Sequence, residues 1–206
     1  MEGCGRYELG RALFGLIPHS NGKIFIDGQS VNIDNPYKAM KLGISFLPRD
    51  RKNEGILKGM SVTRNIAYIH ILKDIVLKNK NYIKIAKDFK ELLNIKMSSL
   101  NQNIQSLSGG NQQKCVIGRW LAKDAKIFIL EEPTRGVDIG TKVEIFNILD
   151  ELVKNKFGII LISSELEEMM NFCDRIIVMF RGKLVKEFFK NEATKEKITA
   201  AATSGR

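Results

Sequence analysis

The chain has 206 residues, of which 44% are hydrophobic and 27% are charged, which fits one globular domain or one domain with a small appendage. No apolar run approaches the roughly 20 residues that a membrane-spanning helix needs, and Met1 is followed at once by Glu2 rather than by a signal peptide. Three widely spaced cysteines (Cys4, Cys115 and Cys173) form neither a disulfide framework nor a metal-binding spacing. We therefore expect a cytosolic chain with ordinary thiols.

The formal net charge of +10 makes nucleic acid and anionic membrane surfaces candidate partners. Much of the excess lies in the lysine-rich stretch 73–96, which has helical periodicity and usually indicates a solvated helix face. The sequence has no zinc-finger or RNA-binding signature, so a basic nucleic-acid-binding module is only a minor alternative. The apolar face of this stretch is expected to contain Ile83, Ile85, Phe89, Leu92 and Leu93.

The first half of the chain predicts a short exposed strand followed mainly by helices. Residues 22–28 alternate apolar and polar side chains between glycines, which indicates an antiparallel strand ending in a tight turn. Asn35 caps a short helix that begins at Pro36 and ends before Gly43. We expect a strand at 44–47 and helices at 61–72 (capped by Ser61), 82–93 and 109–123.

The second half has a different rhythm, with continuous apolar runs that are typical of strands buried on both faces of a parallel sheet. These runs alternate with helical segments, which predicts an α/β fold. Gly182 marks a hairpin turn to a strand at 184–185, and the polar end from Asn191 predicts a frayed helix. The buried strands are expected at 126–130, 159–162 and 176–179, and the helices at 142–154 and 165–172.

Two adjacent carboxylates follow the first of these buried strands, in the stretch KIFILEEPTRGVD from Lys126 to Asp138. The carboxyl edge of a parallel sheet is where such folds bind ligands. There, one carboxylate can hold Mg²⁺ and the next can orient or activate water beside a phosphate. The alternative is an acidic turn after a core strand, and the continuation PTRGVD argues against it.

A second stretch, LSGGNQQK from Leu107 to Lys114, places a serine and two glycines at the start of a helix. The free N–H groups and the dipole of a helix start can bind an anion, although such a start is also a common cap. No GxxxxGK[ST] loop is present to hold the same phosphate. The position of the stretch, one helix length before the carboxylate strand, favours phosphate binding.

Together these stretches resemble the nucleotide-binding domain of an ABC transporter, with LSGGNQQK as the signature loop, ILEEP as the Walker B strand and RGVD as the D-loop. Other stretches are similar to the second such domain of the tandem ATP-binding proteins of monosaccharide importers, of which the ribose, galactose and xylose systems are the type. The resemblance covers residues 3 to about 187. The further stretches are GCGRYEL (3–9), FLPRDRKNEGILKGMSVTRNI (46–66), PTRGVDIGTK (133–142) and ISSELEE (162–168).

The resemblance implies an α/β, ABC-type P-loop NTPase domain with a parallel core sheet, an antiparallel β segment and a helical subdomain. The whole chain, 1–206, corresponds to a partial domain. Its helical subdomain is expected at about 60–124, its RecA-like core at about 125–190 and a polar tail at 191–206. Because Met1 already lies inside the expected Walker A loop, we expect the strand that feeds this loop to be missing and the chain alone to have low stability.

In this family two nucleotide-binding domains pair head to tail, and each ATP lies between the Walker A loop of one and the signature loop of the other. The resemblance therefore implies that Ser108, Gly109 and Gly110 contact the γ-phosphate of an ATP held by a partner domain. It also implies ATP and Mg²⁺ as cofactors, a peripheral position on the cytoplasmic face of the membrane, permease subunits as partners and, indirectly, a sugar-binding protein. The signature-loop residues are Leu107, Ser108, Gly109, Gly110, Asn111 and Gln112, and Asp138 belongs to the D-loop.

The chain's own nucleotide site departs from the pattern of an active ATPase. In the Walker A loop, which includes Gly3 and Gly5, Arg6 stands at the lysine position and Tyr7 at the Mg²⁺-binding Ser/Thr position. Arginine keeps the charge as a bulky fork, and tyrosine cannot place a short hydroxyl near Mg²⁺. Arginine is usual in this family's second domain, whereas tyrosine is less expected.

The remaining site positions depart as well. Glu131 replaces the Walker B aspartate and is the candidate Mg²⁺ ligand, and Glu132 keeps the position of the catalytic glutamate. Ser164 stands at the position of the switch histidine, which neither His19 nor His70 can replace. Arg49 lies at the Q-loop position, and as a cation it cannot coordinate Mg²⁺. The alternative interpretation is that Arg49 is simply a surface substitution.

We therefore predict a second, degenerate nucleotide-binding domain of a sugar ABC importer. It would supply its signature loop to a partner's ATP site, with little or no ATPase activity alone, and its segment 58–72 would face the membrane subunits. A nucleoside importer and a non-functional gene remnant are the alternatives. A self-sufficient ATPase would need the intact Walker A loop and switch histidine that the sequence lacks.

Overall fold

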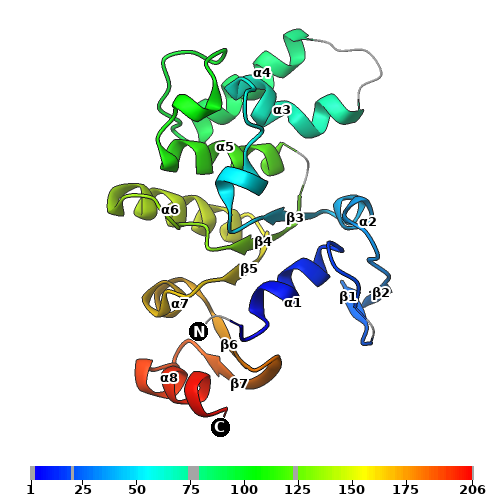
Figure 1. Cartoon of the computed structure of the whole chain (residues 1–206), viewed down its shortest axis with the longest axis vertical. Coiled ribbons are helices and arrows are strands. Elements are labelled where there is room, and N and C mark those ends of the chain that lie inside the picture. Colours follow the sequence, from blue (N-terminus) through cyan, green and yellow to red (C-terminus); the bar gives the residue numbers. More distant parts are fainter. Residues whose placement is uncertain (1–2, 20, 74–78, 123–124, 206) are drawn as a thin grey trace. The chain divides into compact units, whose positions relative to one another are not determined.

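The structure, a computed structural model, describes residues 3–19, 21–73, 79–122 and 125–205 (Figure 1). The chain forms two compact units, one made of residues 1–42 and 160–206 and the other of residues 43–159. The predicted end of the signature helix at Lys123 and the first two residues of the expected Walker A loop region lie outside the described residues.

The first unit combines both ends of the chain. Its N-terminal elements are α1 (Arg6–Leu13), β1 (Ile24–Ile26), β2 (Gln29–Val31) and α2 (Pro36–Lys41). Its C-terminal elements are α7 (Leu166–Phe172), β6 (Arg175–Phe180), β7 (Lys183–Phe189) and α8 (Lys195–Ser204).

The N-terminal elements of this unit confirm the predicted tight turn and the predicted helix cap. β1 and β2 pair antiparallel, with the tight turn at Asp27 and Gly28, which both have left-handed backbone angles (φ 50° and 78°). In α2 the Asn35 side chain accepts a hydrogen bond from the Lys38 N–H at 3.0 Å, and Pro36 occupies the first turn.

The prediction that 176–179 is a strand buried in the parallel sheet is wrong. The hairpin turn predicted at Gly182 is confirmed, since Arg181 and Gly182 (φ 46° and 79°) turn the chain back and β6 pairs antiparallel with β7, but this pair forms a separate two-stranded sheet. Buried and exposed residues alternate along β6, with Ile176 buried and Ile177 46% exposed, as expected for a strand with one covered face.

The C-terminal segment is a well-formed helix and not the frayed one expected. Thr194 caps α8, its Oγ1 accepting from the Lys197 N–H at 3.3 Å. One face of α8 packs against the β6–β7 hairpin, which explains why the helix is ordered despite its polar composition. The shared apolar cluster consists of Ile176, Val178, Phe188, Ile198 and Ala201.

The second unit contains a parallel sheet and a group of helices. Its strands are β3 (Ile44–Leu47), β4 (Ile127–Glu131) and the first part of β5 (Gly158–Ile162). Its helices are the π-helix η1 (Arg51–Gly55), α3 (Val62–Lys73), α4 (Asn79–Leu92), the 3₁₀-helix η2 (Ile104–Ser106), α5 (Gly109–Leu121) and α6 (Ile139–Lys154).

The three strands have the order β3-β4-β5, and β3 pairs parallel with β4 in the register Ile44↔Ile127 to Leu47↔Leu130. β3 and most of β4 are buried, as predicted for a parallel sheet. The prediction of a fully buried strand at 159–162 is wrong, because β5 is buried at Ile162 whereas Ile160 is 40% exposed. β5 is the last strand in this order, and only one of its faces is covered.

Helices α3, α4 and α5 pack against one another (Figure 1). The apolar face of α4 differs from the predicted one: Tyr82, Ala86 and Leu93 are buried, whereas Ile83 and Leu92 are 39% and 68% exposed. Residues 82, 86 and 93 fall on one stripe at helical spacing, and residues 83 and 92 lie beside it.

A buried arginine joins α5 to the segments before it. Arg119 donates to the carbonyl of Gly55 (Nη1, 2.8 Å), to the carbonyl of Asn65 (Nε, 2.7 Å) and to Asn65 Oδ1 (Nη2, 3.0 Å). Asn65 is fully buried and in turn exchanges hydrogen bonds with the backbone of Leu57 in both directions (2.8 and 3.1 Å). Burial lowers the pKa of Arg119 to about 10, which leaves the guanidinium charged at neutral pH.

The packing of α8 can be tested with Ile198→Ala. We expect a loss of about 2–5 kcal/mol in unfolding free energy, because Ile198 is only 4% exposed within the apolar cluster. Thr199→Ala, on the exposed face of α8, is the matched control. Urea unfolding followed by circular dichroism measures both, and equal midpoints for the two variants would contradict the packing.

Candidate functional site

The signature loop opens α5, with Ser108 at the N-cap and its side chain exposed. The two glycines that follow are required by close packing. A Cβ on Gly110 would lie 2.2 Å from Thr141 Cγ2, and one on Gly109 would lie 2.8 Å from Arg51 Nη2 and 3.0 Å from the Gly136 carbonyl. The start of α5 is therefore pressed against the D-loop, the first turn of α6 and η1.

Gln112, one of the predicted signature-loop residues, is buried and only 7% exposed. Its Nε2 donates to the carbonyls of Ile104 (3.3 Å) and Leu107 (3.1 Å), so this side chain holds the entry to the loop in shape. Leu107 is also buried. Of the six predicted signature residues, the structure leaves Ser108, Gly109 and Asn111 accessible at least in part.

The Walker B carboxylates lie where β4 ends. Glu131 is fully buried, and its Oε2 accepts a hydrogen bond from the backbone N–H of Arg49 at 3.2 Å, which brings the Q-loop position to the Walker B strand. Glu132 is 7% exposed and has a left-handed backbone (φ 47°), which is uncommon for a non-glycine residue and frequent at functional sites.

Asp138 of the D-loop caps α6. Its Oδ1 accepts from the Thr141 N–H at 2.9 Å and its Oδ2 accepts from the Thr141 hydroxyl at 2.7 Å. The hydrogen bond from the Thr141 backbone is the largest of the effects that lower the pKa of Asp138. This cap explains why α6 begins at Ile139, three residues before the predicted start.

Among the described residues, no three His, Cys, Asp or Glu side chains gather into a group that could hold a metal ion. Mg²⁺ often binds through one or two carboxylates and takes its other ligands from water and phosphate oxygens. Glu131 and Glu132 at the end of β4 fit that partial role, and any further ligands would have to come from nucleotide and solvent.

The expected Walker A residues lie in the other unit, at the start of α1. Gly3 and Gly5 both have left-handed φ (76° and 94°), and the loop contacts the β6–β7 turn through the Gly182 N–H, which donates to the Cys4 carbonyl at 3.0 Å. The Arg6 guanidinium stacks over the Tyr7 ring (4.6 Å to the centroid), and its Nη2 donates to the Tyr7 hydroxyl at 2.9 Å. Arg6 is thus engaged by its own neighbour.

Ser164, at the switch-histidine position, is exposed after β5. The serine before it has the structural role: Ser163 is buried, and its hydroxyl donates to Glu168 Oε2 (2.9 Å) and accepts from the Glu165 N–H (3.0 Å). Of the two histidines, His19 is exposed, and His70 is half-buried with its Nε2 2.5 Å from the Ala122 carbonyl.

The site residues are therefore divided between the two units. Residues 43–159 bring together the Q-loop position, the Walker B carboxylates, the signature loop and the D-loop. The expected Walker A loop and Ser164 belong to the other unit.

Comparison with known proteins identifies the family. A family model described as "ABC transporter" matches residues 1–135, which is more than half of the chain. The chain belongs to the ABC transporter family. A nucleotide-free ATP-binding cassette from an ABC transporter has a similar fold, with a TM-score of 0.82 at 23% identity over 97% of this chain and 83% of that one. The likeness confirms the predicted α/β ABC ATPase fold, with its parallel sheet and antiparallel strands.

Curated members of the family are considerably more similar in sequence. The ribose import ATP-binding protein RbsA of Bacillus cereus is 43% identical over 208 residues. The xylose import ATP-binding protein XylG of Thermoanaerobacter pseudethanolicus is 42% identical over 210 residues. Each alignment covers 100% of this chain, which spans only 42% of the length of either relative.

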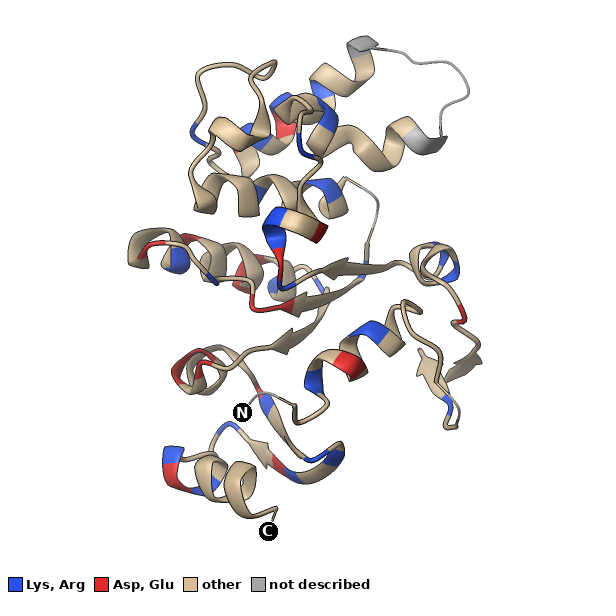
Figure 2. Cartoon of the chain, in the orientation of Figure 1, with Lys and Arg blue, Asp and Glu red and all other residues tan. Residues whose placement is uncertain are grey.

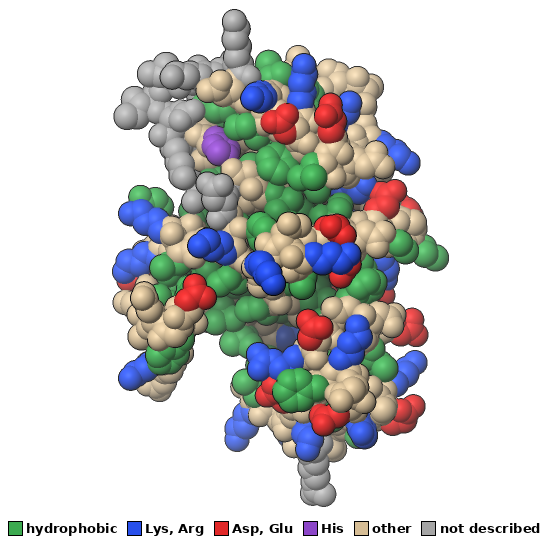
Figure 3. All heavy atoms as spheres, turned by 180° about the vertical axis from the view of Figure 1, so that it is seen from behind, with side chains coloured by type: hydrophobic (Ala, Val, Ile, Leu, Met, Phe, Trp, Pro, Cys, Tyr) green, Lys and Arg blue, Asp and Glu red, His purple; other side chains and the backbone are tan. Residues whose placement is uncertain are grey.

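The distribution of charge in this ABC domain does not favour nucleic-acid binding. Lys and Arg residues are interspersed with Asp and Glu in α1, η1, α4, α6, β7 and α8, whereas the charged residues of α2, α3 and α5 are all basic (Figure 2). On the face seen in Figure 3, basic, acidic and apolar side chains alternate without a continuous basic stripe. A nucleic-acid surface usually needs clustered cations. No helix within the described ranges is long and apolar enough to cross a membrane.

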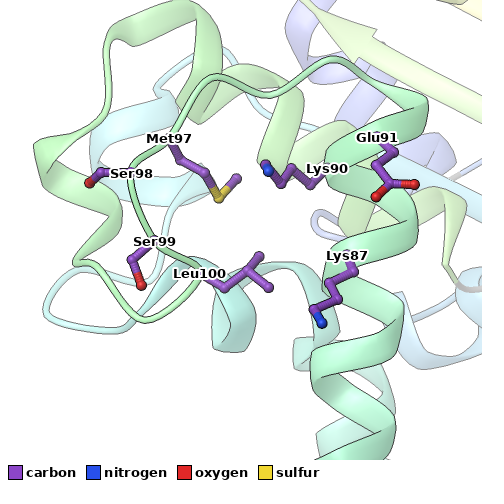
Figure 4. A pocket seen from close by; sticks show the side chains of 7 residues that line it. All are labelled: Lys87, Lys90, Glu91, Met97, Ser98, Ser99 and Leu100. Atoms are coloured by element: carbon purple, nitrogen blue, oxygen red, sulfur yellow. The ribbon is translucent and has the colours of Figure 1, made fainter.

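A pocket of about 240 Å³ lies between α4 and the loop that follows it (Figure 4). None of the predicted ATP-site residues lines it. The lining residues are Lys87, Lys90, Glu91, Met97, Ser98, Ser99 and Leu100.

Sequence reasoning missed several residues that support the site. Arg51 reaches both Gln113 Oε1 and the Arg135 carbonyl at 3.4 Å, and so bridges α5 and the D-loop. Lys114 is buried and pairs with Glu144 of α6. The available signal was the sequence neighbourhood alone, because Arg51 and Lys114 lie within the stretches that carry the resemblance and Glu144 lies just beyond one.

The packing of the signature glycines predicts that Gly110→Ala destabilises the chain. Alanine gains about 1 kcal/mol over glycine in a helix, but the clash with Thr141 costs about 1–3 kcal/mol, so we expect a lower urea midpoint. Adding Thr141→Ser should restore part of the loss, because it removes the Cγ2 that lies 2.2 Å from the new Cβ. Gly140→Ala in α6 is the control, and a Gly110→Ala midpoint at or above it would count against this packing.

The cap at Asp138 predicts a pH-dependent contribution to stability. Because its pKa is lowered in the folded chain, the contribution is present above the ordinary Asp value of 3.8 and is lost as the pH falls through the lower folded value. The difference in melting temperature between wild type and Asp138→Ala should therefore be largest near neutral pH and shrink below 3.8. Thermal unfolding at several pH values measures it, and a difference that stays constant in acid would refute the capping role.

Proposed function

We propose that this chain is the second, degenerate nucleotide-binding domain of a sugar ABC importer and supplies its signature loop to an ATP held by a partner domain. The observation that carries the proposal is the signature loop itself. Ser108 is exposed at the N-terminus of α5. Gly109 and Gly110 are packed closely against the D-loop, η1 and the first turn of α6 in the same unit. A helix start of this kind can donate to phosphate whichever chain holds the rest of the nucleotide.

The sugar class follows from the relatives. RbsA and XylG are named for ribose and xylose import, and both align with all of this chain at 42–43% identity. The chain spans 42% of the length of either relative. The proposed partner is a first nucleotide-binding domain with an intact Walker A loop. Permease subunits and a sugar-binding protein complete the proposed assembly, on the cytoplasmic face of the membrane. The segment 58–72 would face the permease and transmit closure to it.

The chain's own nucleotide site is proposed to have little or no turnover. Arg6 stacks on and hydrogen-bonds to Tyr7, at the two positions where an active loop would present a lysine and a short hydroxyl. Glu131 and Glu132 would line this second site, with Glu131 as the candidate Mg²⁺ ligand, Arg49 at the Q-loop position and Ser164 in place of the switch histidine. Such a site could retain ATP without hydrolysing it.

The test is ATP hydrolysis by the chain alone and after addition of a first domain with an intact Walker A loop. We expect the chain to be inert alone and to stimulate its partner. Ser108→Arg should abolish stimulation, because the larger cation fills the space of the phosphate. Ser30→Arg, on exposed β2, makes the same change away from the loop and should leave stimulation intact.

Other outcomes would reject parts of the proposal. Hydrolysis by the chain alone would show that Arg6, Tyr7 and Ser164 do not prevent turnover. No stimulation of the partner would favour a non-functional remnant. Stimulation that survives Ser108→Arg would remove the proposed role of the signature loop.

A further inference from the structure

The side chain of Asn111 lies between the signature serine and the loop after α4. The Lys96 backbone N–H donates to Asn111 Oδ1 at 2.8 Å, and Asn111 Nδ2 donates to Ser108 Oγ, also at 2.8 Å. A backbone N–H can only donate, so it must face the amide oxygen of Asn111. The Lys96 contact therefore fixes which way the amide points, and its nitrogen is left facing Ser108.

This arrangement determines which part of the Ser108 hydroxyl is available. A hydroxyl has one proton to donate and two lone pairs that accept. Because Asn111 Nδ2 occupies a lone pair of Ser108 Oγ, the hydroxyl proton is directed elsewhere. Ser108 makes no side-chain capping bond within α5 and is exposed, so its proton can point to a ligand beyond the helix start.

We infer that Asn111 is a positioning residue that acts through Ser108 and does not itself bind the nucleotide. Anchored by the Lys96 N–H, it holds Ser108 as a hydrogen-bond donor toward the γ-phosphate of the partner's ATP. The inference rests on the proposed function, since it needs the signature loop to meet a phosphate. It gives an orienting role to Asn111, which the sequence identifies only as a signature-loop residue.

The anchor itself lies outside the motif. Lys96 belongs to the loop between α4 and η2, and the next residues, Met97 to Leu100, form one wall of the pocket in Figure 4. The orientation of Ser108 is thus set by a backbone group from another segment of the same unit.

The test is a double-mutant cycle between Asn111→Ala and Ser108→Ala in the stimulated assay with the partner domain. We expect Asn111→Ala to lower kcat about 10- to 100-fold, comparable to the loss when a group that orients a metal-ligating side chain is removed. In the Ser108→Ala background it should have no further effect, because no hydroxyl is left to orient. Asn147→Ala, on the exposed face of α6, is the matched control and should leave kcat unchanged.

A second measurement needs no nucleotide. Hydrogen exchange of the Lys96 amide, followed by NMR in this chain, should be faster in Asn111→Ala than in wild type and unchanged in Ser108→Ala. Equal exchange rates of the Lys96 amide in wild type and Asn111→Ala would contradict the role of the Lys96–Asn111 hydrogen bond.

The kinetic outcomes separate this inference from the proposed function. If Ser108→Ala lowers kcat and Asn111→Ala does not, the inference fails and the proposed function stands. Equal losses from Asn111→Ala in both backgrounds would also overturn it, because they indicate a general structural effect. If neither Ser108→Ala nor Ser108→Arg affects stimulation, both fail.

Discussion

The unit that contains the signature loop depends on one buried cation. Arg119 lies inside the packing of α3 and α5, and the three oxygens that surround it come from Gly55 and Asn65. Leaving a buried polar group without its hydrogen-bond partner costs about 1–3 kcal/mol, and more when the group is charged, so this contact makes α5, the end of η1 and the start of α3 interdependent. The helix that presents the signature loop cannot shift without moving the segment that follows the Q-loop position.

The same interdependence continues at the other end of α5. Arg51 of η1 contacts both Gln113 of α5 and the D-loop carbonyl of Arg135, and Lys114 of α5 pairs with Glu144 of α6. Both ends of α5 are therefore attached to η1, one through the Gly55 carbonyl and the other through the Arg51 guanidinium. The π-helical turn of η1 fits this role, since such turns are often found at functional sites.

The sequence predicted most of the following helix caps, because a cap is a local pattern. Asn35, Ser61 and Thr194 cap helices, and only the last escaped prediction, because nothing local showed that a polar tail would pack. The hairpin of β6 and β7 was predicted from the turn at Gly182, but its separation from the parallel sheet was missed, because an apolar run does not reveal which strands lie beside it. The orientation of Asn111 and the stacking of Arg6 on Tyr7 depend on contacts within folded loops, which no spacing in the sequence encodes.

The close approach of Thr141 to Gly110 separates two reasons for a glycine in the signature loop. A nucleotide needs an open backbone, but so does the contact between α5 and α6, whether or not any nucleotide is ever hydrolysed. Selection for a folded domain would then preserve Gly110 even in a copy without catalysis. The presence of this glycine in a chain therefore reports the packing of the ABC fold. Whether the chain hydrolyses ATP has to be judged from other residues.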